Sequence, residues 1–438
     1  MMARSGRPGL GVEHGTAGGR QPADEPARAV GRFASLEGYR GLAALFILVY
    51  HVYQYMRAGP LARYPLEGTA WHAFLVGLDS FVGLFFVLSA FLLGLPFARA
   101  ALGRTQTVSA RAFLYRRAVR IVPLYLVAVL VAWAARNRTL PGDWLDLLEH
   151  LTFTQVFDNK RIFYTIGPAW SLAVEVQFYL LLLPLGAAAC AICRRIDSAR
   201  WRVAALLGAV AGLGAVGLVW KTIAWYAVGV GERNWSVWFS LPAKIDVFAV
   251  GLLLAVVVAA RPERAYARLG PRAGLAGAGL LVLVAAFAVN GTDRLPDPFF
   301  HSVTAVGYGL LVAAAVLAPA DGGGRILASA VAVGLGMISY SLYLWHEPVM
   351  LLLADRGMFP APGARSGFPL GVLVLAAVAI PVAWLSYWII EYPVGSLRRS
   401  RDHRGKARDY YADRALSQDY VERGPSQPRR PTATRRFR

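Results

Sequence analysis

The sequence predicts an all-α protein that crosses a membrane about ten times, and three observations favour this fold class. Of the 438 residues, 56% are hydrophobic and 16% are charged, whereas a soluble domain carries about 25% charged residues. Apolar stretches long enough to span a bilayer as helices recur along the whole chain. Between them, arginines gather in every second loop, which is the charge asymmetry of a polytopic membrane protein.

Ten apolar stretches are interpreted as spanning helices. They lie at 40–57, 74–98, 117–135, 168–192, 203–221, 239–260, 273–290, 301–319, 328–353 and 368–390. Residues 1–32 are polar and lack the apolar core of a signal peptide, so we expect a disordered tail. The membrane domain then covers 33–395, and the basic segment 396–438 is expected to be a second disordered tail that suits an anionic lipid surface.

The basic loops predict the orientation of these helices. Arginines cluster after the second, fourth and sixth spans and again near the C-terminus, whereas the other loops are mixed or weakly charged. The positive-inside rule therefore places these loops and both termini in the cytoplasm. The formal net charge of +20 reflects this topology, and nucleic-acid binding is not expected.

The first span carries two ionisable residues on one face. In "YRGLAALFILVYHVY", Arg40 and His51 are eleven residues apart, which is three helical turns plus about 20°. They are therefore expected about 16 Å apart along the helix axis, with Arg40 at the cytoplasmic end and His51 toward the outer half. Because such groups are costly in lipid, we expect them to line an internal cavity.

Three arginines stand at the inner mouth of the third span, in "YRRAVRIVPLY". One interpretation is that they only anchor the topology of the helix. However, Arg120 lies a full turn inside the apolar segment, where a charge facing lipid is costly. Since guanidinium groups suit phosphate oxygens, the alternative is that Arg116, Arg117 and Arg120 bind a cytosolic substrate that carries phosphate.

Further ionisable residues lie inside the fourth and ninth spans. Glu175 needs a partner at its own depth, and His51 qualifies, either for catalysis or in a purely structural ion pair. His346 and Glu347, in "SYSLYLWHEPV", either add polar groups to the same cavity or belong to an interfacial aromatic belt.

Four other residues are assigned structural roles. Asp246 and Glu391 are interpreted as partners of buried arginines that stabilise the fold. Cys190 and Cys193 form a CxxC motif, but no second Cys or His pair lies close in the sequence to complete a zinc site. We therefore expect inert thiols and no bound metal.

Seven motifs, in this order, resemble the acyltransferase family 3 of integral membrane O-acyltransferases. They are "EGYRGLAALFILVYH", "DSFVGLFFVLSAFLL", "YRRAVRIVPLY", "WSLAVEVQFY", "KIDVFAVGLLLA", "SYSLYLWHEPV" and "IIEYP". The resemblance covers roughly 33–395. The sequence departs from the family at Glu37, Ala90 and Val176, where the family usually has Asp, Gly and often a second Glu, so Glu175 is the only carboxylate of its motif.

The resemblance implies a reaction and roles for the candidate residues. The donor would be a cytoplasmic acyl-coenzyme A, with acetyl-coenzyme A the expected form, and its phosphates would be held by Arg40, Arg116, Arg117 and Arg120. The acceptor would be a hydroxyl of a sugar or another carbohydrate-containing molecule. His51 would act as general base, with Glu175 orienting its ring, or His51 would itself be acylated. No bound cofactor is implied.

The resemblance also implies the location of the protein, a multi-pass protein of the cell (inner or plasma) membrane in contact with the lipid bilayer. The competing hypothesis from another functional class is a polytopic transporter of a lipid-linked sugar or a small solute. Such transporters often contain internal repeats, and this sequence has none that we recognise.

Overall fold

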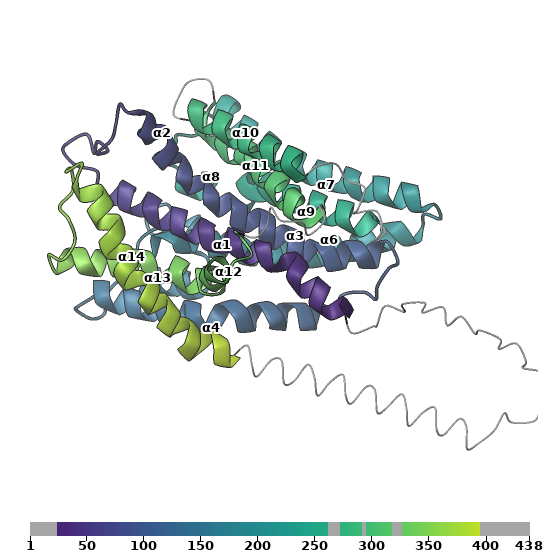
Figure 1. The fold of residues 1–438 in the computed structure, drawn as a ribbon, viewed down its shortest axis with the longest axis horizontal. Helices are drawn as coiled ribbons and strands as arrows, with labels where there is room; N and C mark the ends of the chain where they lie inside the picture. The colour runs from purple at the N-terminus through teal and green to yellow at the C-terminus, as the bar shows by residue number, and fades with distance from the viewer. Residues whose placement is uncertain (1–23, 262–271, 291–294, 318–325, 395–438) are drawn as a thin grey trace, which may run out of the picture.

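The computed structural model describes residues 24–261, 272–290, 295–317 and 326–394, and these residues form helices and loops without named strands. Helix α1 (Asp24–Tyr55) begins inside the segment predicted to be a disordered tail. The remainder of that tail and the predicted tail 396–438 lie outside the described residues. Figure 1 shows the helices running roughly along one direction.

The other α-helices follow in chain order. They are α2 (Ala70–Gly77), α3 (Phe81–Ala101), α4 (Ala110–Arg136), α5 (Trp144–Leu151), α6 (Trp170–Arg194), α7 (Ala199–Thr222), α8 (Trp235–Trp238), α9 (Leu241–Ala260), α10 (Arg272–Val289), α11 (Asp297–Leu317), α12 (Ala330–Met337), α13 (Ser339–Asp355) and α14 (Gly367–Ser386). Short 3₁₀ turns η1 (Leu78–Ser80), η2 (Gln155–Phe157) and η3 (Gly167–Ala169) and π-helical turns η4 (Ile223–Ala227) and η6 (Tyr387–Glu391) connect or extend them.

Seven helical segments of the described chain are long and apolar enough to cross a membrane. They are Ala70–Ala101, Ala110–Arg136, Gly167–Arg194, Ala199–Ala227, Trp235–Ala260, Asp297–Leu317 and Gly367–Val394. These correspond to seven of the ten predicted spans. The remaining three predictions fall on α1, on α10 and on the α12–α13 pair.

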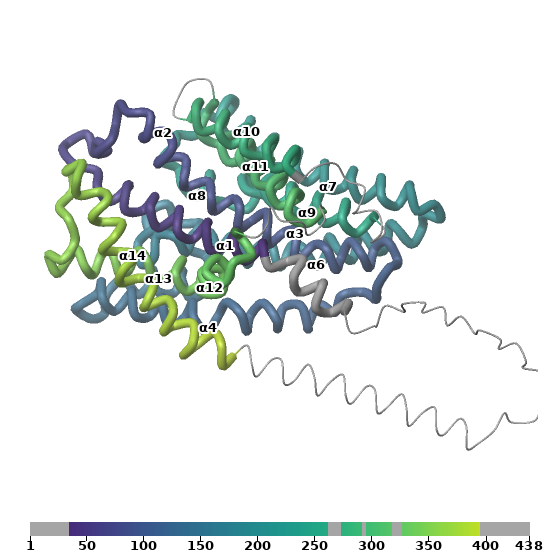
Figure 2. The backbone as a smooth tube through the Cα atoms, viewed as in Figure 1, coloured from purple at the N-terminus to yellow at the C-terminus, as the bar shows by residue number. Residues whose placement is uncertain are grey.

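The predicted ninth span, 328–353, is not one continuous helix. The chain breaks at Ile338 between α12 and α13. Helix α12 packs closely on α1. The two backbones are so near that a side chain at Gly336 would collide with the carbonyl group of Glu37. This close approach of the two backbones explains why a glycine stands at position 336. Figure 2 shows α12 beside the middle of α1.

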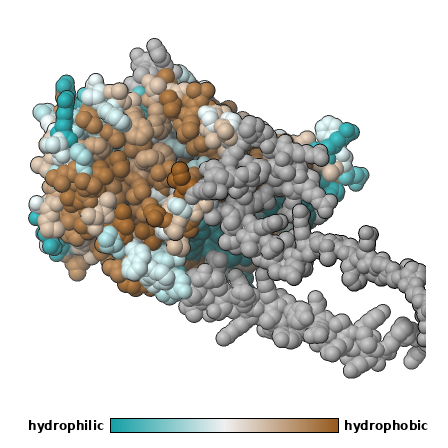
Figure 3. Space-filling view, in the orientation of Figure 1, coloured by the Kyte–Doolittle hydropathy of each residue, from teal (hydrophilic) through white to brown (hydrophobic). Residues whose placement is uncertain are grey.

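The interior of the bundle is apolar. Phe248 of α9 is fully buried, and its ring stacks on those of Phe86 of α3 and Phe178 of α6, with ring centroids 4.6 and 4.1 Å apart. Large apolar side chains are also exposed on the outer faces of several helices, among them Leu281 of α10 and Leu373 of α14. Figure 3 shows one such broad apolar face. Apolar surface of this extent suits contact with lipid, and the chain is a multi-pass membrane protein.

The arginine-rich loops meet at one end of the bundle. The Arg104 guanidinium, after α3, donates hydrogen bonds of 2.7 and 2.9 Å to the carbonyl oxygens of Ala260 and Arg261 at the end of α9. Arg202, at the start of α7, reaches the loop after α3, because a Cβ atom at Gly103 would lie 3.8 Å from its guanidinium group. The loops that follow the second, fourth and sixth predicted spans therefore share one end of the molecule.

Candidate active site

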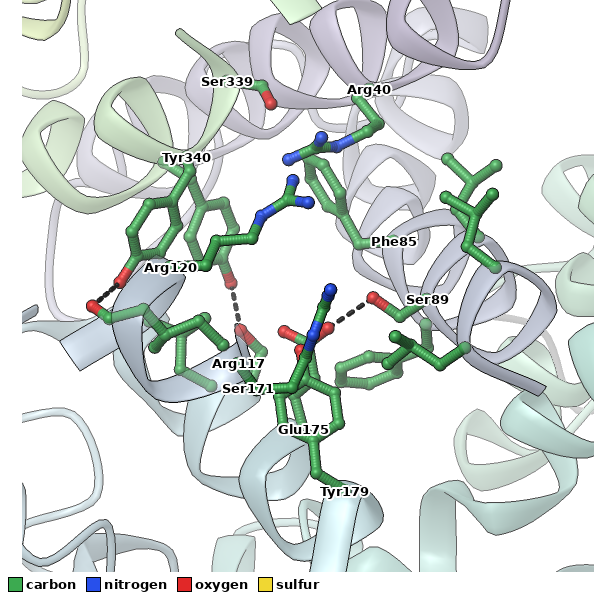
Figure 4. Close-up of a pocket in the computed structure, with 17 residues that line it drawn as sticks. Arg40, Phe85, Ser89, Arg117, Arg120, Ser171, Glu175, Tyr179, Ser339 and Tyr340 are labelled. Atoms are coloured by element: carbon green, nitrogen blue, oxygen red, sulfur yellow. Dashed lines mark hydrogen bonds between the residues drawn. The ribbon is translucent and has the colours of Figure 1, made fainter. Parts of the chain in front are cut away.

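An inner cavity of about 90 Å³ contains most of the predicted arginine site. Arg40 of α1 and Arg117 and Arg120 of α4 line it, together with Ser89 of α3 and Glu175 of α6. Figure 4 shows the three guanidinium groups pointing into the same space. Three cations around one cavity make it a site for an anion, and guanidinium groups favour phosphate and carboxylate oxygens.

Local sequence explains how α4 presents its arginines. The Ser109 hydroxyl accepts a hydrogen bond from the N–H of Ala112 and caps the start of α4. Arg117 and Arg120 are three residues apart, so both lie on the cavity side of the helix. Arg116 lies on another side of α4 and is not among the residues that line the cavity. The structure therefore does not bring Arg116 into the predicted group.

Glu175 lies in the inner cavity and is not paired with His51. Its carboxylate accepts a hydrogen bond from the Ser89 hydroxyl across the contact between α3 and α6 (Figure 4). The sequence placed Glu175 beside His51 because both residues lie inside apolar spans. In the structure, the two side chains line different cavities, so the predicted pairing is wrong.

His51 lines a second, outer cavity of about 460 Å³. Its other polar lining groups include Gln54, Arg57, Asp79, His301 and Glu347, and seven aromatic residues form a large part of its walls. These aromatic residues are Tyr50, Tyr55, Phe163, Trp170, Trp235, Phe239 and Tyr343. A cavity with apolar walls and a few convergent polar groups is the usual form of a site for an organic substrate.

The ring of His51 is held by the carbonyl group of Ile47 and by the ring of His346, which is itself held by the carbonyl group of Leu342. His51 Nδ1 lies 2.9 Å from the carbonyl oxygen of Ile47, and His346 Nδ1 lies 3.1 Å from that of Leu342. A carbonyl only accepts, so each Nδ1 carries the proton. His346 Nε2, 3.2 Å from His51 Nδ1, then accepts from the same N–H. In this neutral tautomer, Nε2 of His51 keeps its lone pair and can act as a base.

Glu347 of α13 lines the outer cavity and faces the turn η3 that precedes α6. Its carboxylate accepts a hydrogen bond from the N–H of Gly167 in η3. A side chain at residue 167 would run into that carboxylate, so only glycine permits the contact. Of the two interpretations offered for His346 and Glu347, the geometry supports polar groups of the cavity. His346 contacts His51 behind the wall, and Glu347 forms part of the wall.

Sequence reasoning missed several polar residues of the outer cavity, among them Gln54, Arg57, Asp79 and His301. His301 Nε2 of α11 lies 3.5 Å from Asp79 Oδ2 of η1. A signal was present, because Asp79 lies within the predicted span 74–98 and His301 follows an aromatic pair at the start of another predicted span.

The partner of Asp246 was also predicted incorrectly. Asp246 forms a buried ion pair with Lys221 of α7, at 2.7 Å, and accepts a hydrogen bond from Ser302. The partner is thus a lysine rather than an arginine. Glu391 accepts a hydrogen bond of 2.5 Å from Ser341.

The two cysteines are free and buried. Within the described parts of the chain, no group of three or more His, Cys, Asp or Glu side chains is placed to hold a metal ion. The groups available for chemistry in these two cavities are therefore imidazoles, carboxylates, guanidinium groups and hydroxyls.

The family of the chain follows from comparison with known proteins. A family model described as an acyltransferase domain, the acyltransferase 3 family, matches residues 33–388. The chain belongs to this family of membrane proteins. It is an acyltransferase that transfers groups other than aminoacyl groups, which argues against the transporter hypothesis.

Named relatives agree with this class. The chain is 29% identical over 409 residues to the acyltransferase MdmB of Streptomyces mycarofaciens, covering 89% of this chain and 98% of the relative. It is 24% identical over 383 residues to the peptidoglycan O-acetyltransferase OatA of Listeria monocytogenes, covering 82% and 55%. It is 22% identical over 334 residues to a putative O-acetyltransferase of Staphylococcus aureus, covering 72% and 50%. The chain spans about half the length of the last two relatives. No solved structure matches it.

Proposed function

We propose that this protein transfers an acyl group from cytoplasmic acyl-coenzyme A to a hydroxyl of a carbohydrate-containing acceptor at the cell membrane. One observation carries the proposal. Helices α1, α3, α6 and α13 each contribute to both cavities, one lined by three guanidinium groups and the other containing His51 with a free Nε2 lone pair. An anion-binding site and a base on shared helices suit a donor that carries phosphates at one end and a thioester at the other.

The proposed topology has ten spans, with both termini in the cytoplasm. Helices α1, α10 and the α12–α13 pair supply the three crossings beyond the seven long apolar segments. Basic loops face the cytoplasm in most membrane proteins, and those of this chain meet at one end of the bundle. In this orientation, Arg40 lies on the cytoplasmic side of His51.

The donor is assigned to the inner cavity. Arg40, Arg117 and Arg120 would bind phosphate oxygens of coenzyme A, and the pantetheine arm would extend between the helices toward the outer cavity. Glu175 offsets part of the positive charge, and Ser89 holds its carboxylate in place. In this account Glu175 shapes the donor site rather than orienting the base. Acetyl is the expected acyl group, and Arg116 has no assigned contact with the donor.

The chemical step is assigned to His51. Nε2 removes the proton of the acceptor hydroxyl while the hydroxyl oxygen attacks the thioester carbonyl carbon. The C–S bond then breaks, coenzyme A leaves as a thiolate, and the proton on His51 passes to that sulfur. Ile47 and His346 hold the ring throughout. If His51 is instead acylated, the same nitrogen attacks the thioester first, and rapid quenching would trap an acyl-imidazole.

The outer cavity suits a carbohydrate-containing acceptor. Aromatic side chains such as Trp170 and Trp235 offer flat apolar faces to a sugar ring, while Asp79, His301 and Glu347 are available for its hydroxyls. The peptidoglycan O-acetyltransferase among the relatives acts on a glycan according to its name, which supports the same class of acceptor here.

The test is an assay with purified protein in lipid nanodiscs. Radiolabelled acetyl-coenzyme A is supplied with a glycan-rich extract of the host envelope, and free thiol and alkali-labile label on the acceptor are measured. We expect both signals from the unaltered protein and neither from His51→Ala. Failure of the unaltered protein to bind acetyl-coenzyme A would contradict the proposal.

A further inference from the structure

One side chain separates the inner and outer cavities. Among the described residues, Tyr343 of α13 is the one that lines both cavities. On α6, the consecutive residues Trp170 and Ser171 lie on the two sides of the same boundary, because Trp170 lines the outer cavity and Ser171 the inner one. The wall between the cavities therefore lies where α13 meets the start of α6.

Hydrogen bonds hold this wall closed. The Tyr343 hydroxyl lies 2.7 Å from the Ser171 hydroxyl, and both lie 3.0 Å from the carbonyl oxygen of Pro168. Tyr343 and Ser171 are 6% and 4% exposed, so water does not replace these bonds without a movement. The ring of Phe85 packs edge-on against Tyr343, with centroids 5.7 Å apart. Figure 4 shows Ser171 at the edge of the inner cavity.

We propose that Tyr343 and Ser171 form a latch between the donor and acceptor cavities, and that the acyl group reaches His51 only when this latch opens. The inference rests on the proposed function. A donor held by arginines in the inner cavity must bring its thioester carbon to a base in the outer cavity, and Tyr343 lies between the two. Tyr343 and Ser171 are positioning residues in this account.

The latch has two consequences. When closed, it keeps the thioester away from His51 and from the water of the outer cavity, and so limits hydrolysis when no acceptor is bound. When open, the space left by the Tyr343 ring limits the length of the acyl chain that passes. Tyr343→Phe removes only the hydroxyl, whereas Tyr343→Ala also widens the passage.

The chain offers a matched control. The Ser80 hydroxyl lies 2.8 Å from the Tyr308 hydroxyl and donates to the carbonyl oxygen of Gly77 at 2.7 Å. This repeats the arrangement of Ser171, Tyr343 and Pro168, with the serine bonded to the carbonyl three residues earlier. Tyr308 is fully buried but lines neither of the two cavities. Tyr308→Phe thus removes an equivalent hydroxyl that lies outside both cavities and away from the wall between them.

The experiment measures release of free coenzyme A from acetyl-coenzyme A in nanodiscs without acceptor, together with the Kd of coenzyme A. Loss of one buried hydrogen bond shifts an equilibrium by about fivefold. We therefore expect Tyr343→Phe and Ser171→Ala each to raise hydrolysis about fivefold, with an unchanged Kd. The double variant should not exceed Tyr343→Phe, because that substitution alone already removes both hydrogen bonds that cross the wall, to Ser171 and to Pro168. Adding His51→Ala should abolish the increase, and Tyr343→Ala should extend turnover to hexanoyl-coenzyme A.

Equal hydrolysis by Tyr343→Phe, Tyr308→Phe and the unaltered protein, with normal coenzyme A binding, would overturn the latch alone. An increase that survives His51→Ala would also overturn it, because the thioester would then reach water by another route. Failure of the unaltered protein to bind coenzyme A would overturn the proposed function and the latch together. A destabilised Tyr343→Phe protein is recognised by its Kd, and Ser171→Ala then serves as the test of the latch.

Discussion

The inner and outer cavities are built on the same four helices, yet their linings differ in kind. The inner cavity is surrounded by Arg40, Arg117 and Arg120 with one carboxylate, Glu175. The outer cavity has aromatic walls and a neutral His51–His346 pair at its edge. Helix α4 contributes to the inner cavity, whereas η1, α8 and α11 and their flanking residues contribute to the outer one.

This difference separates binding from chemistry along a single helix. Arg40 and His51 both belong to α1, and each takes its function from the surroundings that other helices supply at its depth. Cations gathered at one level favour a phosphate-bearing group, which contributes binding energy far from the reacting carbon. At the other level, the base lies among aromatic rings and carboxylates, with one arginine, Arg57, in place of the three of the inner cavity. Substitutions at the two levels should therefore have different kinetic effects.

The largest effect is expected at His51. His51→Ala should lower transfer by about 10² to 10⁴-fold, the usual contribution of a general base, while the Kd of coenzyme A stays unchanged. Single-turnover transfer at saturating donor measures this loss. The control is His72→Ala, which changes a histidine of α2 that lines neither cavity. Near-normal transfer by His51→Ala would show that His51 is not the general base.

The next effect is expected at the arginines of α4. Hydrogen bonds to charged groups contribute about 1.5–3 kcal/mol, so Arg117→Ala or Arg120→Ala should raise the KM for acetyl-coenzyme A at least about tenfold. The KM for acetyl-pantetheine, which lacks the nucleotide phosphates, should not change. Arg116→Ala is the matched control, since this neighbour does not line the cavity. Equal losses with both donors would indicate that Arg117 and Arg120 only support the fold.

A smaller, divided effect is expected from the two carboxylates. Glu175→Gln should change the KM for the donor by about three- to tenfold, because it lies among the donor arginines. Glu347→Gln should affect the acceptor side instead, since its partner is the N–H of Gly167 in the outer cavity. Donor KM measured for both variants distinguishes them. A loss of turnover at Glu175→Gln as severe as that at His51→Ala would restore the predicted pairing of these two residues.

The smallest effect concerns the rim of the outer cavity. The backbone N–H of Asp146, followed by the Arg161 guanidinium, lowers the pKa of the Asp143 carboxyl. Because the folded-state pKa lies below its ordinary value, this stabilisation is present at neutral pH and is lost as the pH falls through that pKa. The amide protection factors of the loop that carries Phe163, which correct for the intrinsic pH dependence of exchange, should then fall at acidic pH. Asp143→Asn should remove this pH dependence, and an unchanged dependence would contradict the assignment.

The sequence was sufficient for the arrangement of single helices but not for contacts between them. The sequence predicted a group of three arginines on α4, of which Arg117 and Arg120 line one cavity, and apolar length identified seven segments that can span a membrane. The pairing of Glu175 with His51 failed because the sequence assigned both residues the same depth in the membrane. In the structure, Glu175 lies at the level of the arginines, where it contacts Ser89, whereas His51 lines the other cavity.

The break at Ile338 shows a second reason for error. Residues 328–353 form one apolar run, so hydropathy alone predicts one helix. In the structure, α12 ends at Met337 and packs closely on the backbone of α1 through Gly336, and α13 begins at Ser339. This break also sets the start of α13, the helix that carries Tyr343 and His346. The positions of these two residues beside the cavities depend on how α13 packs, which hydropathy does not predict.

The account makes one central claim, that the donor phosphates lie in the inner cavity and the acyl end points to His51 past Tyr343. The most direct measurement is a cryo-electron microscopy structure with a non-hydrolysable thioether analogue of acetyl-coenzyme A. We predict phosphate density within hydrogen-bonding distance of Arg40, Arg117 or Arg120 and the acyl end beside Tyr343. Phosphate density in the outer cavity, or an acyl end directed away from His51, would contradict the account.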